Sequence, residues 1–484
     1  MKVVVQLALA ACACLLAGCY GFRPSSGGGQ ISGNVSRSIN ANDVALPPGY
    51  RIEPIARGLT FPTSATFDER GALFIVESGY CYGEVWTTPR LLRVETNGAV
   101  SVIASAGRNG PWTGVAFHDG AFFVAEGGAL EGGKILRITR DGKITAIVDG
   151  LPSFGDHHTD GPAVSPDGWI YFGQGTASNS GVVGEDSAKF GWLKRRPDFH
   201  DVPGADIMLA GENFETKDVV GTESRRKVKT GAFVPFGTTT QPNQIIKGRV
   251  KCSGGVLRVR PDGSDLQLVA WGFRNPFGLA FAQDGQCYVT DNGYDDRGSR
   301  PVWGSPEVLW KLQSGAWYGW PDFSAGEPVN TEHFDPPGKL RPKFILAKHP
   351  NAPPKPVTTF AVHSSADGLD FSRSDRFGHV GQAFVALLGD ESPATGKSLE
   401  PVGFKIVRVD VRTGIVQDFA VNRGRVNGPA SKLRRGGLER PVSVRFNPGG
   451  DELVVVDFGI IRHDKTGAHP EQGTGVIWRI ARVP

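Results

Sequence analysis

The sequence predicts an all-β protein, a six-bladed β-propeller of four-stranded blades with long loops on its top face. Three observations lead to this prediction. One hairpin pattern recurs six times, further alternating segments lie between the copies, and 66 glycines and 34 prolines divide the 484 residues into short segments. Closed β architectures built from repeats reach this length as one unit.

Each copy of the pattern has a small or proline-containing start, an alternating apolar strand, a glycine turn and a second strand. The six copies are 61–78, 111–126, 158–175, 275–292, 364–389 and 441–459. The alternating segments between them are 91–104, 135–148, 256–269, 404–419 and 476–483. These segments supply the outer strands, so that two hairpins make each blade.

The N-terminal segment predicts export. Lys2 precedes an apolar stretch that ends at Leu16, which is too short for a membrane span. Residues 16–19, Leu-Ala-Gly-Cys, resemble the bacterial lipobox, in which the cysteine is acylated. We therefore expect a signal peptide over 1–18 and a lipid on Cys19.

The rest of the chain then divides into a tether and a body. Residues 19–48 are rich in Gly, Ser and Asn and predict a flexible tether, and residues 49–484 predict the propeller. Such a protein would sit on the cell-envelope membrane, at its periplasmic or extracellular face. A formal net charge of +4 is too small to indicate a nucleic-acid partner.

Three cysteines remain in the predicted body. Cys287 lies inside an apolar strand pattern and is expected to be a buried free thiol. A disulfide between Cys81 and Cys252 is compatible with an exported protein, but spacing alone does not establish it.

Two insertions interrupt the repeat, at about 178–251 and 294–356. Long insertions in a propeller emerge as loops on one face, where they can roof a central pocket. We expect them to form the substrate lid.

The residues that precede the innermost strands should converge on the propeller axis. His157 and Arg274 share one offset from the closing apolar residue of their strands, and His363 and Arg440 lie one step away. A histidine is suited to general-base catalysis, with Asp156 as its neighbour, and a guanidinium is suited to an oxyanion or an anionic cofactor. The alternative is that these are loop residues that make caps and turns.

An oxygen-rich loop, Asp-Asn-Gly-Tyr-Asp-Asp, occupies residues 291–296 directly after the fourth hairpin. Hard cations such as calcium prefer carboxylate and carbonyl oxygens. The loop lacks the EF-hand spacing, so a solvated turn is an equal alternative.

Three segments together resemble the soluble glucose and sorbosone dehydrogenases that use pyrroloquinoline quinone (PQQ). They are Asp156-His157 with 165–171, then 272–281, and then 317–321. The resemblance spans about residues 46–483 and implies a PQQ- and calcium-dependent dehydrogenase that oxidises an aldose or a related sugar or alcohol.

The resemblance also implies roles for individual residues. His157 would take the hydroxyl proton while a hydride passes to the quinone, and Arg274 and Asn275 would contact the quinone oxygens. The backbone carbonyls of Gly293 and Tyr294 would ligate the calcium. Electrons would then pass to a membrane acceptor, a quinone or a cytochrome.

Two positions depart from the glucose-type pattern, in which a lysine and an Arg-x-Arg pair hold the cofactor carboxylates. Residues 388–391 stand where the lysine is expected, and Arg440 alone remains of the pair. Buried carboxylates need cations. The candidates near enough in sequence to substitute are Lys397, Arg434 and Arg435.

Two other functions stay open on the sequence. The first is a non-catalytic propeller that binds a carbohydrate or a protein, which the missing cations favour. The second is a calcium-dependent lactonase, which would need three or four side-chain oxygens at the axis.

Overall fold

The computed structural model describes residues 36–484 apart from 83, 222–225, 337, 392–394, 396, 397, 399, 465, 466 and 484. The predicted signal peptide, Cys19, the first part of the predicted tether and Lys397 lie outside the described residues. The described chain is built almost entirely from antiparallel strands, which confirms the all-β class. The described helices are α2 (Glu185–Lys189), α3 (Trp192–Arg195) and the 3-10 turns η1 (Ala41–Asp43) and η2 (Glu332–Phe334).

Six large sheets have the same order, and each begins with one of the six predicted hairpins. The first strands are β3 (Pro62–Phe67), β9 (Trp112–His118), β13 (Thr159–Val164), β21 (Pro276–Phe281), β28 (Ala366–Phe371) and β32 (Pro441–Phe446). The second strands are β4 (Leu73–Glu77), β10 (Ala121–Glu126), β14 (Ile170–Gln174), β22 (Cys287–Asp291), β29 (Ala383–Leu387) and β33 (Glu452–Asp457).

The outer half of each sheet completes it to four strands. The third strands are β7 (Arg90–Val94), β11 (Gly133–Thr139), β19 (Gly255–Val259), β23 (Glu307–Lys311), β30 (Lys405–Asp410) and β36 (Gly475–Arg482). The fourth strands are β8 (Val100–Ser105), β12 (Ile144–Leu151), β20 (Gln267–Trp271), β27 (Thr358–Phe360), β31 (Ile415–Asn422) and β2 (Tyr50–Leu59).

The first strands of the sheets contact one another in chain order, from β3 through β9, β13, β21 and β28 to β32, and β32 contacts β3 again. Apolar side chains fill the spaces between successive sheets. For example, Phe74 and Val76 of the first sheet pack with Val115 and Phe122 of the second. Strand alternation explains this, because the side chains of one strand point in turn to its two faces, and both faces are covered.

The hairpin turns follow from their sequences. In the first hairpin, Asp68 Oδ1 accepts hydrogen bonds from the backbone N–H groups of Arg70 (3.0 Å) and Ala72 (2.8 Å). Gly71 has a φ of 78°, a conformation that a glycine adopts without steric cost. The Asp-x-x-Gly sequence therefore predicts the turn that joins β3 to β4.

The two ends of the described chain are tied into the sheets. β2 pairs antiparallel with β36, with Tyr50 opposite Arg482, so the sixth sheet contains strands from both ends. β1 (Val44–Ala45) adds to the edge of the fifth sheet through β31. Arg37 makes ion pairs with Glu439 (3.1 Å) and Asp457 (2.7 Å). Residues 36–48, which the sequence assigned to the tether, thus lie against the body.

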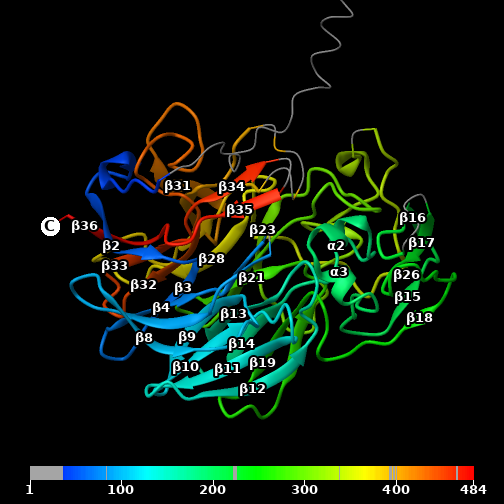
Figure 1. The fold of residues 1–484 in the computed structure, drawn as a ribbon, viewed down its shortest axis with the longest axis horizontal. Helices are drawn as coiled ribbons and strands as arrows, with labels where there is room; N and C mark the ends of the chain where they lie inside the picture. Colours follow the sequence, from blue (N-terminus) through cyan, green and yellow to red (C-terminus); the bar gives the residue numbers. More distant parts are fainter. Residues whose placement is uncertain are drawn as a thin grey trace, which may run out of the picture.

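The two insertions associate with each other. β15 (Ile207–Leu209) of the first insertion pairs with β18 (Ile245–Ile246) and with β26 (Leu346–Lys348) of the second. Figure 1 shows this small sheet, α2 and α3 on one side of the molecule, beside the large sheets. The remaining short strands are β5 (Tyr80–Cys81), β6 (Val85–Trp86), β16 (Asn213–Lys217), β17 (Lys227–Gly231), β24 (Phe323–Ser324), β25 (Glu327–Pro328), β34 (Ile461–Asp464) and β35 (Gly467–Pro470).

A buried ion pair lies within the second insertion. The Arg300 guanidinium donates to Asp322 Oδ1 at 2.9 Å, and both side chains are fully buried. Asp322 also accepts the backbone N–H groups of Ile345 and Leu346. This arrangement anchors the second insertion because each buried charge has a partner.

The three cysteines of the body are buried and free. Cys287, on β22, matches the predicted buried thiol. Cys81 and Cys252 lie in separate apolar clusters and are not paired. No described helix has both the length and the apolar character needed to cross a membrane.

Candidate active site

A cavity of about 200 Å³ lies where the six first strands converge. Each of those strands contributes one lining residue, and these are Thr63, Thr113, Asp160, Phe277, Asp367 and Val442. The loops after the hairpins supply most of the other side chains. The cavity is therefore in the axial position that the repeat predicts.

His157 lines this cavity, as predicted. Its Nδ1 lies 2.9 Å from the carbonyl oxygen of Thr176, and a carbonyl can only accept, so Nδ1 carries the proton. The Nε2 atom is then the unprotonated nitrogen of the ring. Burial lowers the pKa of His157 well below its ordinary value, and the nearby Arg274 and Arg297 charges lower it further. His157 is thus held as a neutral imidazole with a free basic nitrogen.

Asp156 does not orient His157. Its Oδ1 accepts from the Trp192 indole at 2.6 Å and its Oδ2 accepts from Arg297 at 2.7 Å. The predicted catalytic aspartate is therefore the counter-ion of Arg297, and Thr176 is the residue that fixes the histidine ring. Adjacency in sequence did not bring the two side chains together, because both carboxylate oxygens of Asp156 bind partners from the first and second insertions.

Arg274 lines the cavity and belongs to a buried charge network. It donates to Asp295 Oδ2 at 2.6 Å and to Asn179 Oδ1 at 2.9 Å, and Asp295 also pairs with Arg297 at 2.9 Å. We call Asp156, Arg274, Asp295 and Arg297 the paired network. Its two guanidinium groups hold the pKa of Asp295 below its usual value despite burial. Asp295 belongs to the oxygen-rich loop 291–296, and the structure pairs it with two arginines.

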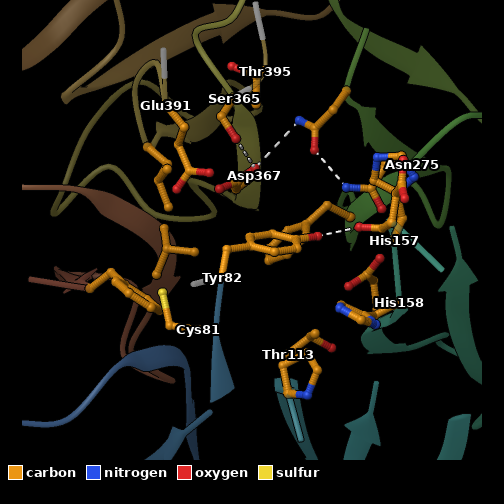
Figure 2. A pocket seen from close by; sticks show the side chains of 18 of the residues that line it. Cys81, Tyr82, Thr113, His157, His158, Asn275, Ser365, Asp367, Glu391 and Thr395 are labelled. Carbon is orange, nitrogen blue, oxygen red and sulfur yellow. Dashed lines mark hydrogen bonds between the residues drawn. The ribbon is translucent and has the colours of Figure 1, made fainter. Parts of the chain in front are cut away.

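Asn275 and Asp367 belong to a chain of hydrogen bonds along the cavity wall (Figure 2). Asn275 Nδ2 donates to Asn292 Oδ1 at 2.8 Å, and Asn292 Nδ2 lies 3.5 Å from Asp367 Oδ1. Ser365 donates to the same carboxyl oxygen at 3.0 Å. The Oδ1 atom of Asn275 is buried and has no hydrogen-bond partner. It is therefore an acceptor that a ligand in the cavity can use.

His158 also lines the cavity, although alternation predicts that it points away. Its Nδ1 donates to the carbonyl of Ser153 at 3.3 Å, and its Nε2 is buried without a partner. Burial lowers its pKa to about 4. Tyr82, which the sequence analysis did not identify, lies in the middle of the cavity wall and donates its hydroxyl to the carbonyl oxygen of Asp156 (Figure 2).

A second group of carboxyl side chains lines the cavity without such cations. These are Asp160, Asp367 and Glu391, which we call the acidic set. Burial raises the pKa of all three. The charge of Asp367 raises the pKa of Asp160 further, and the charges of Glu391 and of Glu307, another carboxyl group of the cavity wall, raise that of Asp367. Glu391 stands in the segment 388–391, where the glucose-type pattern has a lysine.

Of the predicted carboxylate-binding cations, the three that the structure describes do not line the cavity. Arg440 is 1% exposed and donates to the carbonyl oxygens of Gly389 and Asp390, both at 3.1 Å, so it supports the loop and does not line the cavity. Arg434 and Arg435 are exposed. Lys397 lies outside the described residues.

The predicted calcium ligands, the backbone carbonyls of Gly293 and Tyr294, lie in the loop directly after β22. Gly293 lines the cavity and donates its N–H to Glu307 at 2.8 Å, and the Tyr294 side chain packs in the apolar cluster of the insertions. Among the described residues, no group of three or more His, Cys, Asp or Glu side chains is arranged to hold a metal ion.

Solved structures with the same arrangement of strands are sugar dehydrogenases. The PQQ domain of a pyranose dehydrogenase from Coprinopsis cinerea, in its holo form, is 15% identical, with 94% of this chain and 99% of that chain covered and a TM-score of 0.55. The soluble aldose sugar dehydrogenase from Escherichia coli, in its apo form, is 13% identical, with 90% and 100% covered and a TM-score of 0.52.

A third match is the PQQ-bound aldose sugar dehydrogenase from Streptomyces coelicolor, at 15% identity, 90% and 99% coverage and a TM-score of 0.50. The chain has the fold of these sugar dehydrogenases. No family model and no curated protein matches the sequence.

The donor set of this cavity does not fit PQQ, which carries three carboxyl groups. The described residues that line the cavity include six carboxyl groups and two guanidinium groups, and both guanidinium groups already pair with carboxylates. A buried anion without a cation is strongly disfavoured. The residues near the expected quinone oxygens, His157, Arg274 and Asn275, are present, but the cations for the carboxylates are not found in the described part of the cavity.

Proposed function

We propose that this chain is a dehydrogenase that oxidises the CH–OH group of an aldose or a related sugar or alcohol, with His157 as the general base. The observation that carries the proposal is the fixed tautomer of His157. Its Nδ1–H is bonded to Thr176, and its basic Nε2 is left for a ligand in the cavity. A neutral histidine with this arrangement can accept a hydroxyl proton at neutral pH.

The reaction divides the two hydrogens of the alcohol. His157 Nε2 takes the hydroxyl proton, and the hydrogen on the same carbon leaves as a hydride to a two-electron acceptor, which gives a carbonyl product. The guanidinium of Arg274 supplies positive charge beside the developing alkoxide, and the Asn275 amide oxygen can accept a hydrogen bond from another hydroxyl. Because the cavity does not fit PQQ, we assign no step to PQQ or to calcium.

We also infer that the six sheets are the blades of a closed six-bladed propeller over residues 49–484. The cyclic contacts of the first strands and the pairing of β2 with β36 support this. The position of the cavity follows from it, because a propeller brings equivalent residues of all blades to one axis.

Dye reduction tests the activity. The purified full chain is supplied with PQQ and calcium, or with other two-electron acceptors alone, and aldoses are offered with an artificial dye. We expect aldose-dependent reduction with at least one acceptor, and its loss in His157→Ala but not in His333→Ala, an exposed histidine away from the cavity. Sugar binding without turnover under every condition would instead indicate the non-catalytic binding protein.

We further propose that Cys19 carries the lipid that holds the protein on the cell-envelope membrane. The protein would then pass its electrons to a quinone or a cytochrome in that membrane. The lipobox-like residues 16–19 support this. Cys19→Ser should move the protein from the membrane to the soluble fraction, whereas Cys14→Ser, in the predicted signal peptide, should not. Equal membrane association of the Cys19→Ser and unmodified chains would contradict the proposal.

A further inference from the structure

The acidic set is buried and forms no ion pair with a described cation, although the charge of Arg440 opposes the rise in the pKa of Glu391. Asp160 is 2% exposed and Asp367 is 3% exposed, and both line the cavity with Glu391. They come from β13, from β28 and from the loop after β29. Figure 2 shows Asp367 and Glu391 in the part of the cavity away from His157. Three acidic groups that share one small cavity repel one another when they are ionised.

The hydrogen bonds of the set are incomplete. Asp367 accepts from Ser365 and lies near the Asn292 amide, which are both neutral donors. Asp160 Oδ2 is buried and has no hydrogen-bond partner. A buried carboxyl oxygen without a donor is costly unless a ligand supplies one. This atom marks a place where the cavity lacks a donor.

The described cations near the cavity are already used. Arg274 and Arg297 pair with Asp295, and Arg297 also pairs with Asp156 and Asp186. Arg440 donates to two backbone carbonyls behind the cavity wall. The missing positive charge is therefore expected on the ligand.

An organic cation suits this space better than a metal ion. The described residues of the acidic set do not form a metal-binding group. Aromatic side chains line the same cavity, and these are Tyr80, Tyr82, Phe190, Phe277 and Phe458. Aromatic faces attract organic cations and pack against the apolar face of a sugar ring.

We propose that the acidic set binds the ammonium group of an amino sugar, so that the preferred ligand of the cavity is a cationic sugar. The inference names a substrate class for the site. Binding of the sugar does not depend on the proposed function, whereas its oxidation rests on that function. The ammonium donates three hydrogen bonds, one of them to Asp160 Oδ2. The same carboxyl groups disfavour an anionic ligand.

Calorimetric binding to the purified full chain tests this without any redox step. Glucosamine, glucose and N-acetylglucosamine serve as probes, because only the first carries a positive charge. We expect glucosamine to bind at least tenfold more tightly than the other two. Asp160→Asn and Asp367→Asn should each reduce that preference at least fivefold, and Asp198→Asn, an exposed control, should not. Thermal unfolding of each variant verifies that it is folded.

Each other outcome has a defined meaning. Equal affinities for the three sugars, no sugar binding, or a preference that survives both substitutions would overturn the proposal. If calcium alone displaces glucosamine in a competition experiment, the acidic set is a metal site, and the proposal is also overturned. If the preference and its loss are observed but no sugar is oxidised, the inference stands and the proposed dehydrogenase function fails.

Discussion

The paired network and the acidic set line one cavity, but only the carboxyl groups of the paired network form ion pairs with described cations. In the paired network, Arg274 and Arg297 are buried with their carboxylate partners at 2.6–2.9 Å. In the acidic set, no described cation is within ion-pair distance, and Asp160 Oδ2 has no donor. The first region is complete in the protein alone, and its two guanidinium groups lower the pKa of the neighbouring His157. The second is complete only with a ligand, which makes it the region that selects the ligand.

The largest effect is expected at the base. His157→Ala should lower turnover by about 10²- to 10⁴-fold, because it removes general-base assistance. His158→Ala, on the neighbouring cavity residue, should cost much less, since the His158 Nδ1 bond to Ser153 serves the local fold. Steady-state rates of both variants with the same sugar and dye provide the measurement. Equal losses would show that the base is wrongly assigned.

This comparison also shows which features of the site the sequence can predict. The repeat predicted all six hairpins and placed His157, Arg274 and Asn275 in one cavity, because a repeat offset is a local property of the chain. The partners of these residues come from other parts of the chain. Arg297 reaches Asp156 across 141 positions, and no spacing rule predicts such a contact.

The acidic set has the same limitation. Glu391 was noted as a departure from a family pattern, but its position in the cavity depends on the loop after β29. Asp160 and Asp367 each follow the start of a first strand and sit inside the repeat, so their offset could have identified them. The offset that identifies His157 lies three positions earlier in the repeat than Asp160.

Removing one charge from each region should change the free energy of unfolding by different amounts. Asp295→Asn leaves two buried guanidinium groups short of a partner and should cost about 3–5 kcal/mol in unfolding free energy. Asp160→Asn removes an unpaired carboxyl group and should change stability by less than about 1 kcal/mol, or raise it. Chemical denaturation of the two variants compares them directly. A larger loss for Asp160→Asn would mean that the acidic set has partners of its own.

A pH series examines a buried carboxyl group that supports the paired side. Asp201 accepts the N–H of Ala177 at 2.6 Å and the Ser178 hydroxyl, next to the carbonyl that fixes His157. Burial raises its pKa to about 7. Its contribution is therefore fully present below about pH 4, where the unfolded chain is also protonated, and is lost as the pH rises to about 7.

Asp201→Asn keeps one acceptor oxygen for the Ala177 N–H, places an NH₂ group next to the Ser178 hydroxyl, and cannot ionise. The variant should gain stability relative to the unmodified chain between about pH 4 and pH 7, by about 1 kcal/mol per pH unit at most. Unfolding free energies measured across this range test it, with the exposed Asp198→Asn as control. A difference that does not change with pH would mean that Asp201 keeps an ordinary pKa.

The smallest effect is expected when the charge of one member of the acidic set is reversed. Glu391→Lys places a cation in the segment where the glucose-type pattern has a lysine, and it removes one of the carboxyl groups that oppose an anionic ligand. PQQ binding, measured by absorbance titration, should tighten about tenfold in the variant, while glucosamine binding should weaken. Glu332→Lys, on the exposed turn η2, adds the same charge away from the cavity and should change neither affinity. The unmodified chain could instead bind PQQ as tightly as the Glu391→Lys variant does. In that case cations outside the described residues, with Lys397 among them, neutralise the carboxylates of PQQ. The ligand preference assigned to the acidic set would then be wrong.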